Sequence, residues 1–361
     1  MLKFHPGVYA VGKNYQIIIT TKTESFVSVK IENNLYVDDS NGILKSSSGT
    51  HTIEVPQEVL NSSGHYTVIE KKIIKRLPYF SRTEDDIYFE YDFKPVTEDN
   101  PKCYHIADAH NEKIKTVNAA LAYGKPDFLI LNGDIPEDSG QISNFYTIFE
   151  IVSNITEGNI PTVFTRGNHD LRGNCAEKIV DYTPNMNGNS YYSFRLGNIW
   201  GLCLDCGEDK PDDNEEYGHT VACHQFRVKE TEYIKHIIEN RANEYDETGV
   251  RHKIIVVHSP FTHEFEKPFD IEKDIFTEWC RLLKEFIKPE IMICGHTHKL
   301  GIYEPGCDYD TYGQPCTVVV ASETEKKKHF TGTGFEFGND EIKITFTNNR
   351  GDIVDSISMK I

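Results

Sequence analysis

Polar side chains follow five apolar runs of the sequence at the point where each run ends. The runs lie at 104–107, 128–131, 161–165, 253–257 and 291–294, and each is short enough to be a buried β-strand. In open α/β sheets the loops beyond the carboxyl ends of the strands form the site, so these side chains are predicted to converge. The polar residues that follow the runs are Asp108, His110, Asp134, Asn168, His169, Asp170, His258, His296 and His298.

The last of these runs ends in Gly-His-Thr-His, which places His296 and His298 one residue apart. In an extended chain, side chains at i and i+2 point to the same side, so both imidazoles could reach one metal centre. A single histidine after a strand is more often a hydrogen-bonded turn residue. Five such pieces in order, one of them the tetrapeptide Gly-Asn-His-Asp at 167–170, are much less expected by chance.

The donor set indicates two metals rather than one. Two aspartates, one asparagine and four histidines give seven oxygen or nitrogen donors, too many for a single tetrahedral zinc. Two cations that share a carboxylate suit this number, and Asp134 is the natural bridge. A pair of cations lowers the pKa of a bridging water and clamps the attacking and leaving oxygens of a displacement at phosphorus. The chemistry predicted is phosphoester hydrolysis.

Two different patterns of residue types along the chain predict two domains. Residues 7–93 contain short runs rich in β-branched and aromatic residues, which predict an all-β sandwich of about seven strands. A polar linker at 94–102 follows, and beyond it strands alternate with helices, which is typical of βαβ units. We therefore expect a sandwich domain at 1–95 and an α/β domain at 96–361. Helices are predicted near 111–123, 143–153, 223–241 and 273–287, and the last 45 residues return to strands.

Composition limits the classes of partner. The chain has 361 residues and a net charge of −18, and its one dense basic run is Lys326–Lys328, so a nucleic-acid partner is not expected. The sequence lacks an apolar stretch long enough to cross a membrane and an export signal at its start, so we expect a cytoplasmic protein. Most of its nine cysteines should then be free thiols, including the Cys203–Cys206 pair. No sequence pattern indicates the oligomeric state.

The ordered motifs resemble those of the calcineurin-like metallophosphoesterase superfamily over roughly residues 103–300. The motifs are Asp-Ala-His at 108–110, Gly-Asp at 133–134, Gly-Asn-His-Asp at 167–170, Val-Val-His-Ser-Pro at 256–260 and Gly-His-Thr-His at 295–298. The resemblance implies an α/β (α+β) domain of four αββα layers with mixed sheets. A preceding sandwich of fibronectin III or immunoglobulin type is similar to the layout of purple acid phosphatases.

The resemblance also implies a role for each site residue. One metal would be held by Asp108, His110, Asp134 and His298, and the second by Asp134, Asn168, His258 and His296. His169 is implied to contact the phosphate and to stabilise the transition state or protonate the leaving oxygen. Asp170 would orient His169 and raise its pKa, or cap a helix. Arg166 would neutralise phosphate charge or form a structural salt bridge, and Asn168 and His169 would join it in binding substrate.

Two departures restrict the comparison within the superfamily. Purple acid phosphatases have a tyrosine ligand three residues after the bridging aspartate, where this chain has Glu137, and their first motif lacks the counterpart of His110. The serine/threonine phosphatase motif Asp-Arg-Gly is also absent.

We therefore expect two ions drawn from Fe, Mn, Zn or Co, and a small-molecule phosphomonoester or phosphodiester as substrate. The alternatives are a nuclease, or a binding or scaffold protein with a vestigial metal site. Residues 204–220 and 258–269 are candidate rims of the site. In 204–220, Asp205, Tyr217 and His219 are candidate substrate contacts, and the alternative is a solvated acidic loop.

Overall fold

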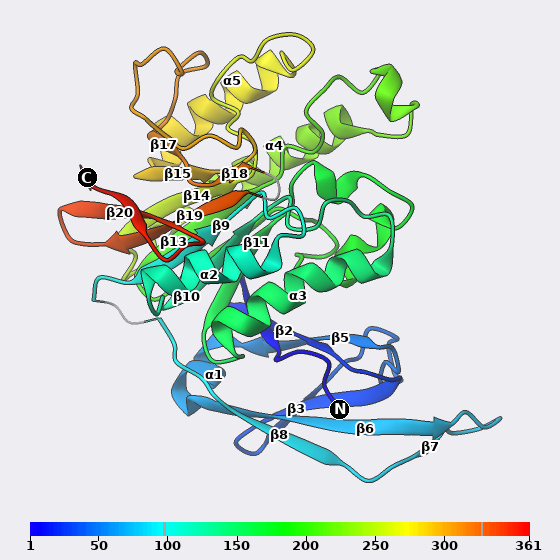
Figure 1. Cartoon of the computed structure of the whole chain (residues 1–361). Helices are drawn as coiled ribbons and strands as arrows, with labels where there is room; N and C mark the ends of the chain where they lie inside the picture. Colours follow the sequence, from blue (N-terminus) through cyan, green and yellow to red (C-terminus); the bar gives the residue numbers. More distant parts are fainter. Residues whose placement is uncertain (97–98, 326–327) are drawn as a thin grey trace.

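Two β-sheets packed face to face, with helices on both outer faces, form the main body of the protein. The computed structural model describes residues 1–96, 99–325 and 328–361 (Figure 1). The larger sheet has the order β21 (Ile353–Lys360), β20 (Glu341–Asn348), β19 (His329–Phe337), β9 (Lys102–Ile106), β10 (Phe128–Asn132), β11 (Pro161–Thr165), β1 (Gly7–Val11), β2 (Asn14–Thr20) and β5 (Thr50–Pro56), and β18 (Glu323–Glu325) pairs with β19.

The second sheet of the main body is mixed, like the first. Its order is β12 (Tyr192–Leu196), β13 (Ile199–Leu204), β14 (His252–Val257), β15 (Ile291–Cys294), β17 (Thr317–Val320) and β16 (Gly301–Tyr303). Strands β13, β14, β15 and β17 pair in parallel, and β9, β10 and β11 do so in the larger sheet. The carboxyl ends of the parallel strands therefore meet at one edge, where the sequence places its polar residues.

Alternation of side chains along the strands separates the core into layers. In β10, Phe128 and Ile130 face the second sheet, and Leu129 and Leu131 face the helices. The helices on that side are α2 (Lys113–Tyr123) and α3 (Ile142–Thr156). On the other side α4 (Cys223–Glu239), α5 (Lys273–Leu282) and the π-helical turn η5 (Leu283–Ile287) cover the second sheet, with Trp279 fully buried. The predicted four αββα layers and the predicted helices are confirmed.

The N-terminal sandwich is confirmed, but one of its two leaves belongs to the larger sheet. Strand β1 pairs in parallel with β11, and β2 and β5 extend that sheet further. The other leaf consists of β4 (Asn34–Val37), β3 (Ser25–Ile31), β6 (His65–Lys75), β7 (Arg82–Thr83) and β8 (Ile87–Asp92), with the short helix α1 (Gln57–Ser63) at one end. Hydrogen bonds therefore join residues 1–95 to residues 96–361, and the division into domains at residue 95 stays a prediction.

Other expectations concern the linker, the basic run and the cysteines. The linker 94–102 and the basic run 326–328 each fall partly outside the described residues, at 97–98 and 326–327. All nine cysteines are free, including Cys203 and Cys206. Among the described residues, no helix combines the length and the apolar character needed to cross a membrane. The part of the chain that the structure describes also contains four short 3-10 helices: η1 (His169–Leu171), η2 (Ala176–Asp181), η3 (Glu215–Tyr217) and η4 (Arg241–Asn243).

Candidate metal centre

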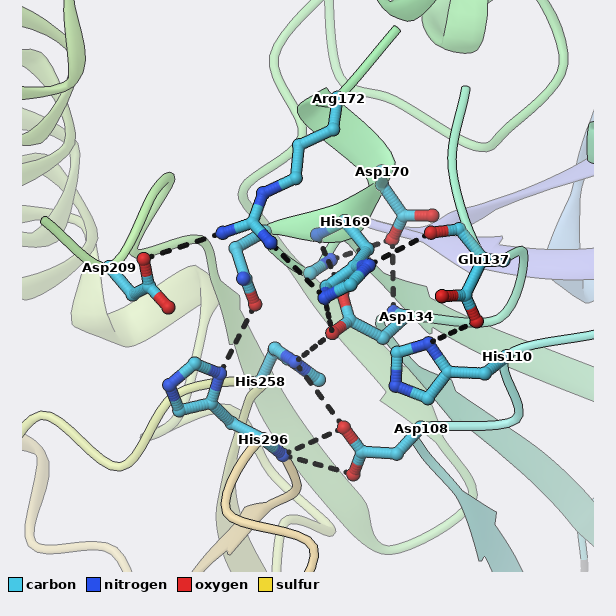
Figure 2. Close-up of polar contacts among 12 residues, drawn as sticks. Asp108, His110, Asp134, Glu137, His169, Asp170, Arg172, Asp209, His258 and His296 are labelled. Carbon is cyan, nitrogen blue, oxygen red and sulfur yellow. Dashed lines mark hydrogen bonds and ion pairs between the residues drawn. The ribbon is translucent and has the colours of Figure 1, made fainter. Parts of the chain in front are cut away.

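The carboxyl ends of β9, β10, β11, β14 and β15 bring all seven predicted ligands to one edge of the two sheets. Figure 2 labels Asp108, His110, Asp134, His258 and His296 among them. The Nε2 atom of His298 lies 3.2 Å from Asp108 Oδ1 and 3.1 Å from His110 Nε2. The Nε2 atom of His258 lies 3.2 Å from Asp134 Oδ2. Among the described residues, three groups each bring their donor atoms within 4.8 Å of one another, namely Asp108–His110–His298, Asp108–Asp134–His258 and His110–Glu137–His169.

The two histidines of Gly-His-Thr-His go to different places. His298 joins Asp108 and His110, whereas His296 Nδ1 lies 3.1 Å from Asn168 Oδ1. The expected extended chain is wrong here, because His296 has φ 70° and His298 has φ 56°. The left-handed backbone turns the chain between the two side chains, so one short motif reaches Asp108 and His110 with His298 and reaches Asn168 with His296.

The donor atoms of the site suit bound cations, and the buried Nε2 atom of His258 is the evidence for this. The Nε2 atom of His258 is buried and has no hydrogen-bond partner among the described residues, although it faces Asp134 at 3.2 Å and Asp108 at 3.7 Å. Its Nδ1 atom lies 2.7 Å from the carbonyl oxygen of Asn132, which fixes the ring and leaves Nε2 for a metal. Imidazole, carboxylate and amide donors in this mixture suit first-row transition metals.

The electrostatics of the site agree with this fit. Burial would lower the pKa of His258, but the carboxylates of Asp134 and Asp108 raise it to about 10, so without an ion this ring carries the positive charge that a bound cation would supply in its place. Burial lowers the pKa of His110 and of His296 to about 4, so these rings are neutral at pH 7 and can offer lone pairs to a metal. Burial opposes ionisation of Asp134, yet His258 holds the pKa of this carboxyl well below its usual range. The carboxylates are thus ionised and require positive charge nearby.

Strained backbone builds the loops that carry the ligands. Asp108, His110, Asp134, His296 and His298 all have positive φ, which non-glycine residues rarely adopt and which clusters at functional sites. Glycines supply the space around them. A Cβ on Gly133 would lie 2.6 Å from Gly167 N and from His258 Nδ1, and a Cβ on Gly167 would lie 2.6 Å from Asp134 N. The two loops can approach this closely only because both positions lack side chains.

Backbone and side-chain donors orient the two aspartates. The backbone N–H of His296 donates to both Asp108 oxygens at 3.0 and 3.1 Å, and Ser322 Oγ donates to Asp108 Oδ2 at 2.6 Å. The backbone N–H of His169 donates to Asp134 Oδ1 at 2.8 Å. Ser322 was not expected from the sequence, because it lies far from every motif and only the sheet packing brings it to the site.

His169 lies beside the candidate metal ligands Asp134 and His110, and its ring points toward them. Its Nε2 atom is 4.0 Å from Asp134 Oδ2, and its ring centroid is 4.7 Å from that of His110. Its Nδ1 atom lies 2.8 Å from the carbonyl oxygen of Glu137, which accepts when Nδ1 carries the proton. The residue that stands where purple acid phosphatases have tyrosine therefore orients His169 through its backbone.

Asp170 does not orient His169, which corrects the expectation from the sequence. Its Oδ2 atom accepts from the backbone N–H groups of Gly167 and Asp134, at 2.8 and 3.2 Å. The side chain reaches back three residues, as an acidic residue does in a capping box, and so turns away from the imidazole. Burial and then the charge of Asp134 raise the pKa of Asp170 to about 7. Its observed role is to join the loops that follow β10 and β11.

Of the two arginines near the site, only Arg172 lines the cleft. Arg166 binds Asp205 Oδ2 through Nε and through Nη2, each at 2.7 Å, so the structural salt bridge that the sequence left open is observed. Arg172 places Nη1 3.2 Å from His169 Nε2. The sequence offered no signal for Arg172 beyond its position three residues after His169.

A cleft of about 320 Å³ opens over the site, between two rims. It is lined by Asp134, Asn168, His169, Arg172, Asp209, Phe265, Phe269, His296, Thr297 and His298. Asp209 comes from residues 204–220, and Phe265 and Phe269 come from residues 258–269, so both predicted rims are confirmed. The candidate contacts Asp205, Tyr217 and His219 are not among the lining residues. Asp205 holds Arg166, and the Tyr217 hydroxyl donates to Glu208 or Asp209.

Comparison with known proteins agrees with this arrangement. A family model described as calcineurin-like phosphoesterase matches residues 101–300, more than half of the chain. The chain belongs to this family. As a metallophosphoesterase it carries every predicted ligand within or at the edge of the matched segment. No curated protein matches the chain.

Two solved structures are similar to this chain at low sequence identity. A purple acid phosphatase from yellow lupin (Lupinus luteus) seeds matches 99% of this chain and 74% of its own, with 14% identity and a TM-score of 0.61. A dimetal phosphatase from Danio rerio matches 74% of this chain and 99% of its own, with 12% identity and a TM-score of 0.48. The first match covers the sandwich as well as the metallophosphoesterase body, so the purple-acid-phosphatase-like layout predicted from the sequence is confirmed.

Proposed function

We propose that this metallophosphoesterase uses two metal ions to hydrolyse small phosphomonoesters or phosphodiesters. The observation that carries the proposal is the pair of carboxylate and imidazole groups centred on Asp108 and Asp134, at the floor of an open cleft. Asp108, His110, Asp134 and His298 would hold one ion, and Asp134, Asn168, His258 and His296 the other. Bound cations would activate water and offset the charge that develops on the phosphoryl oxygens.

The chain's own residues would carry out the remaining steps. Asn168 and His169 would bind the phosphoryl group at the cleft floor. The carbonyl of Glu137 accepts from His169 Nδ1 when that atom carries the proton. The acid step would then need a second proton on Nε2, with Arg172 Nη1 turned from Nε2 to the substrate, so that Nε2 presents its N–H to the leaving oxygen. As water adds to phosphorus and the ester P–O bond breaks, this proton would pass to the departing alcohol. Asp170 would act by fixing the loops that carry Asp134 and Asn168.

The acidic character of the molecule supports a small substrate rather than a nucleic acid. The net charge is −18, and Glu208 and Asp209 stand beside the one arginine that lines the cleft. A polyanion with many phosphates would meet repulsion over much of this surface. The ions would be Fe, Mn, Zn or Co, since the donors suit each of them. Nine free cysteines support the cytoplasmic location that the sequence predicts.

Metal content and turnover test the proposal together. We expect close to two metals per chain by elemental analysis, and turnover of p-nitrophenyl phosphate or bis-p-nitrophenyl phosphate that is lost on chelation and restored by Mn²⁺. The preferred ester would distinguish a monoesterase from a diesterase. A metal-loaded protein that is silent toward a broad panel of phosphoesters would instead favour a binding or scaffold role.

The role of His169 has its own test. We expect His169→Ala to lower kcat by about 10²- to 10⁴-fold, the usual contribution of a general acid, with metal content unchanged. The matched control is His236→Ala, because His236 is exposed on α4 and outside the cleft. Unchanged turnover in the metal-loaded His169→Ala protein would remove His169 from the reaction.

A further inference from the structure

Arg166 is the arginine for which the motif comparison left open phosphate binding or a structural salt bridge, and its contacts make it a structural residue. Nε and Nη2 both bind Asp205, and Asp205 also accepts from Ser190 Oγ at 2.5 Å. The guanidinium lies 5.5 Å from the ring centroid of Phe226 on α4. Arg166 thus ties the end of β11 to the loop after β13, and it is not among the residues that line the cleft.

Arg172, rather than Arg166, lies in the cleft beside His169, where a phosphate-binding arginine would be needed. It follows η1 directly, and its backbone N–H donates to the carbonyl oxygen of His169 at 3.1 Å. Its side chain lines the cleft together with Asp134, Asn168 and His169. Figure 2 shows Nη1 directed at the Nε2 atom of His169, the atom that faces Asp134. A group that binds between Asp134 and His169 would therefore meet Arg172 as well.

An acidic clamp fixes the orientation of Arg172. Glu208 is 2% exposed, and its carboxylate accepts from Arg172 Nε at 2.9 Å and from Arg172 Nη2 at 2.7 Å in a bidentate pair. Asp209 lies 3.4 Å from Nη2. Tyr217 OH is 3.2 Å from Glu208 Oε2 and 3.0 Å from Asp209 Oδ1, and it accepts from the backbone N–H of Lys210 at 3.0 Å. The loop 204–220 thus holds the guanidinium in one geometry.

Arg172 has N–H donors that its contacts with Glu208 and Asp209 do not use. A guanidinium has five N–H groups. The clamp uses those of Nε and Nη2, and Nη1 has one contact among the described residues, to His169. Because the two acidic partners offset its charge, Arg172 would contribute directed hydrogen bonds rather than long-range attraction. Its planar fork suits phosphoryl oxygens better than a lysine would.

We propose that Arg172 binds a non-bridging phosphoryl oxygen through Nη1, beside His169, and that Glu208, Asp209 and Tyr217 position it for this contact. The proposal rests on the proposed phosphoesterase function and adds a substrate-binding residue to it. It also gives the rim 204–220 a role: this loop prepares the phosphoryl site through Arg172.

Direct binding of inorganic phosphate tests the proposal without turnover. Isothermal titration of the manganese-loaded full chain should show that Arg172→Ala binds phosphate roughly 10- to 100-fold more weakly, the loss expected for a charge-assisted hydrogen bond. Arg172→Lys should lose less, and added guanidinium ion should partly restore binding to Arg172→Ala. For the p-nitrophenyl esters, KM should rise in the same order.

Arg281 offers a matched control, because it is clamped in the same way outside the cleft. On α5 its Nε and Nη2 bind Glu278 at 2.8 and 2.9 Å, and its Nη1 binds Glu285 at 2.6 Å. We expect Arg281→Ala to leave phosphate affinity unchanged. A structural role alone would instead lower the unfolding midpoint of Arg172→Ala without changing phosphate affinity or responding to guanidinium.

The outcomes separate this proposal from the proposed function. Unchanged phosphate affinity in folded, metal-loaded Arg172→Ala would overturn the assignment, as would the absence of phosphate binding in the unaltered protein. If Arg172→Ala does not fold, Arg172→Lys decides: wild-type phosphate affinity in that variant overturns the assignment. A protein that binds phosphate through Arg172 but turns over no phosphoester would retain the phosphate site and lose the phosphoesterase function.

Discussion

Asn132, the last residue of β10, joins the two sheets directly behind the metal centre. Its side-chain Nδ2 lies 3.1 Å from the carbonyl oxygens of Val257 and Ile293 and 3.0 Å from His105 Nε2, and its Oδ1 accepts from the Thr165 hydroxyl. Val257 and Ile293 lie on the two strands that end at the ligand loops. A fully buried network of this kind sets the spacing of the sheets and so of the ligands.

Replacing Asn132 should therefore affect both stability and metal binding. We expect Asn132→Leu to lower the free energy of unfolding by about 3 kcal/mol, because it leaves several buried polar groups without partners. Metal affinity should fall by roughly 10-fold, since the backbone of this residue also fixes His258. Urea denaturation and metal titration measure the two effects. The control Asn154→Leu, on the exposed surface of α3, should show neither; equal stabilities would mean that the network does not hold the sheets.

His105 gives the fold a dependence on pH whose sign follows from its burial. It is fully buried, and burial lowers its pKa from 6.5 to about 3. Between these values the unfolded chain binds a proton that the folded chain does not, so this contribution to stability is present above pH 6.5 and is lost as the pH falls toward 3. From pH 7 to pH 5 the loss is about 2 kcal/mol.

Comparison with His105→Gln isolates this contribution, because the variant cannot take up the proton. Urea denaturation of both proteins at pH 7, 6 and 5 should show that the unaltered chain loses more stability than the variant as the pH falls. Parallel pH profiles would show that His105 is not the group responsible.

At the residue scale, the sequence was sufficient to predict which candidate metal ligands converge and insufficient for the residues that orient them. Asp108, Asp134 and His258 could be predicted because each follows an apolar run within a short motif. Asn132 and Ser322 could not, because their partners lie far away in sequence and only the packing of the sheets brings them together. Asp170 was assigned the wrong partner, since its neighbour His169 was close in sequence but its side chain turns back to Gly167.

At the scale of elements, hydrophobic patterns predicted the helices and strands but not the shape of the loops. The run 128–131 and the alternation after residue 103 correspond closely to β10 and to the βαβ units. The positive φ values at His296 and His298 have no signal in residue type, because neither is glycine. They depend on contacts such as the two bonds from the His296 N–H to Asp108, which form only in the folded protein.

At the scale of the whole molecule, the N-terminal segment completes the sheet that carries the site. Val8 and Tyr9 of β1 pair with Pro161 and Thr162 of β11, and Tyr9 is fully buried against the helix side of the sheet. Composition changes at residue 95 and so predicted a boundary in the chain. It could not reveal that β1 is inserted next to β11, because the pairing of parallel strands leaves no local pattern in the sequence.

Removal of residues 1–95 should therefore prevent folding of the remainder rather than release an independent domain. The truncated chain would expose the paired edge of β11, all of whose residues are buried, and the face of α3 that packs on Phe4. An unpaired, apolar strand edge promotes association between chains. We expect aggregates by size-exclusion chromatography and no cooperative thermal transition.

A second deletion provides the control for the truncation. Replacing residues 76–81 with an Asn-Gly turn removes the exposed tip between β6 and β7, where Tyr79 and Phe80 are 92% and 82% exposed. That protein should fold and bind metal like the unaltered chain, since the tip contributes nothing to the larger sheet. A monodisperse, metal-binding fragment of residues 96–361 would contradict this prediction. It would show that β11 tolerates a free edge and that residue 95 marks a true domain boundary.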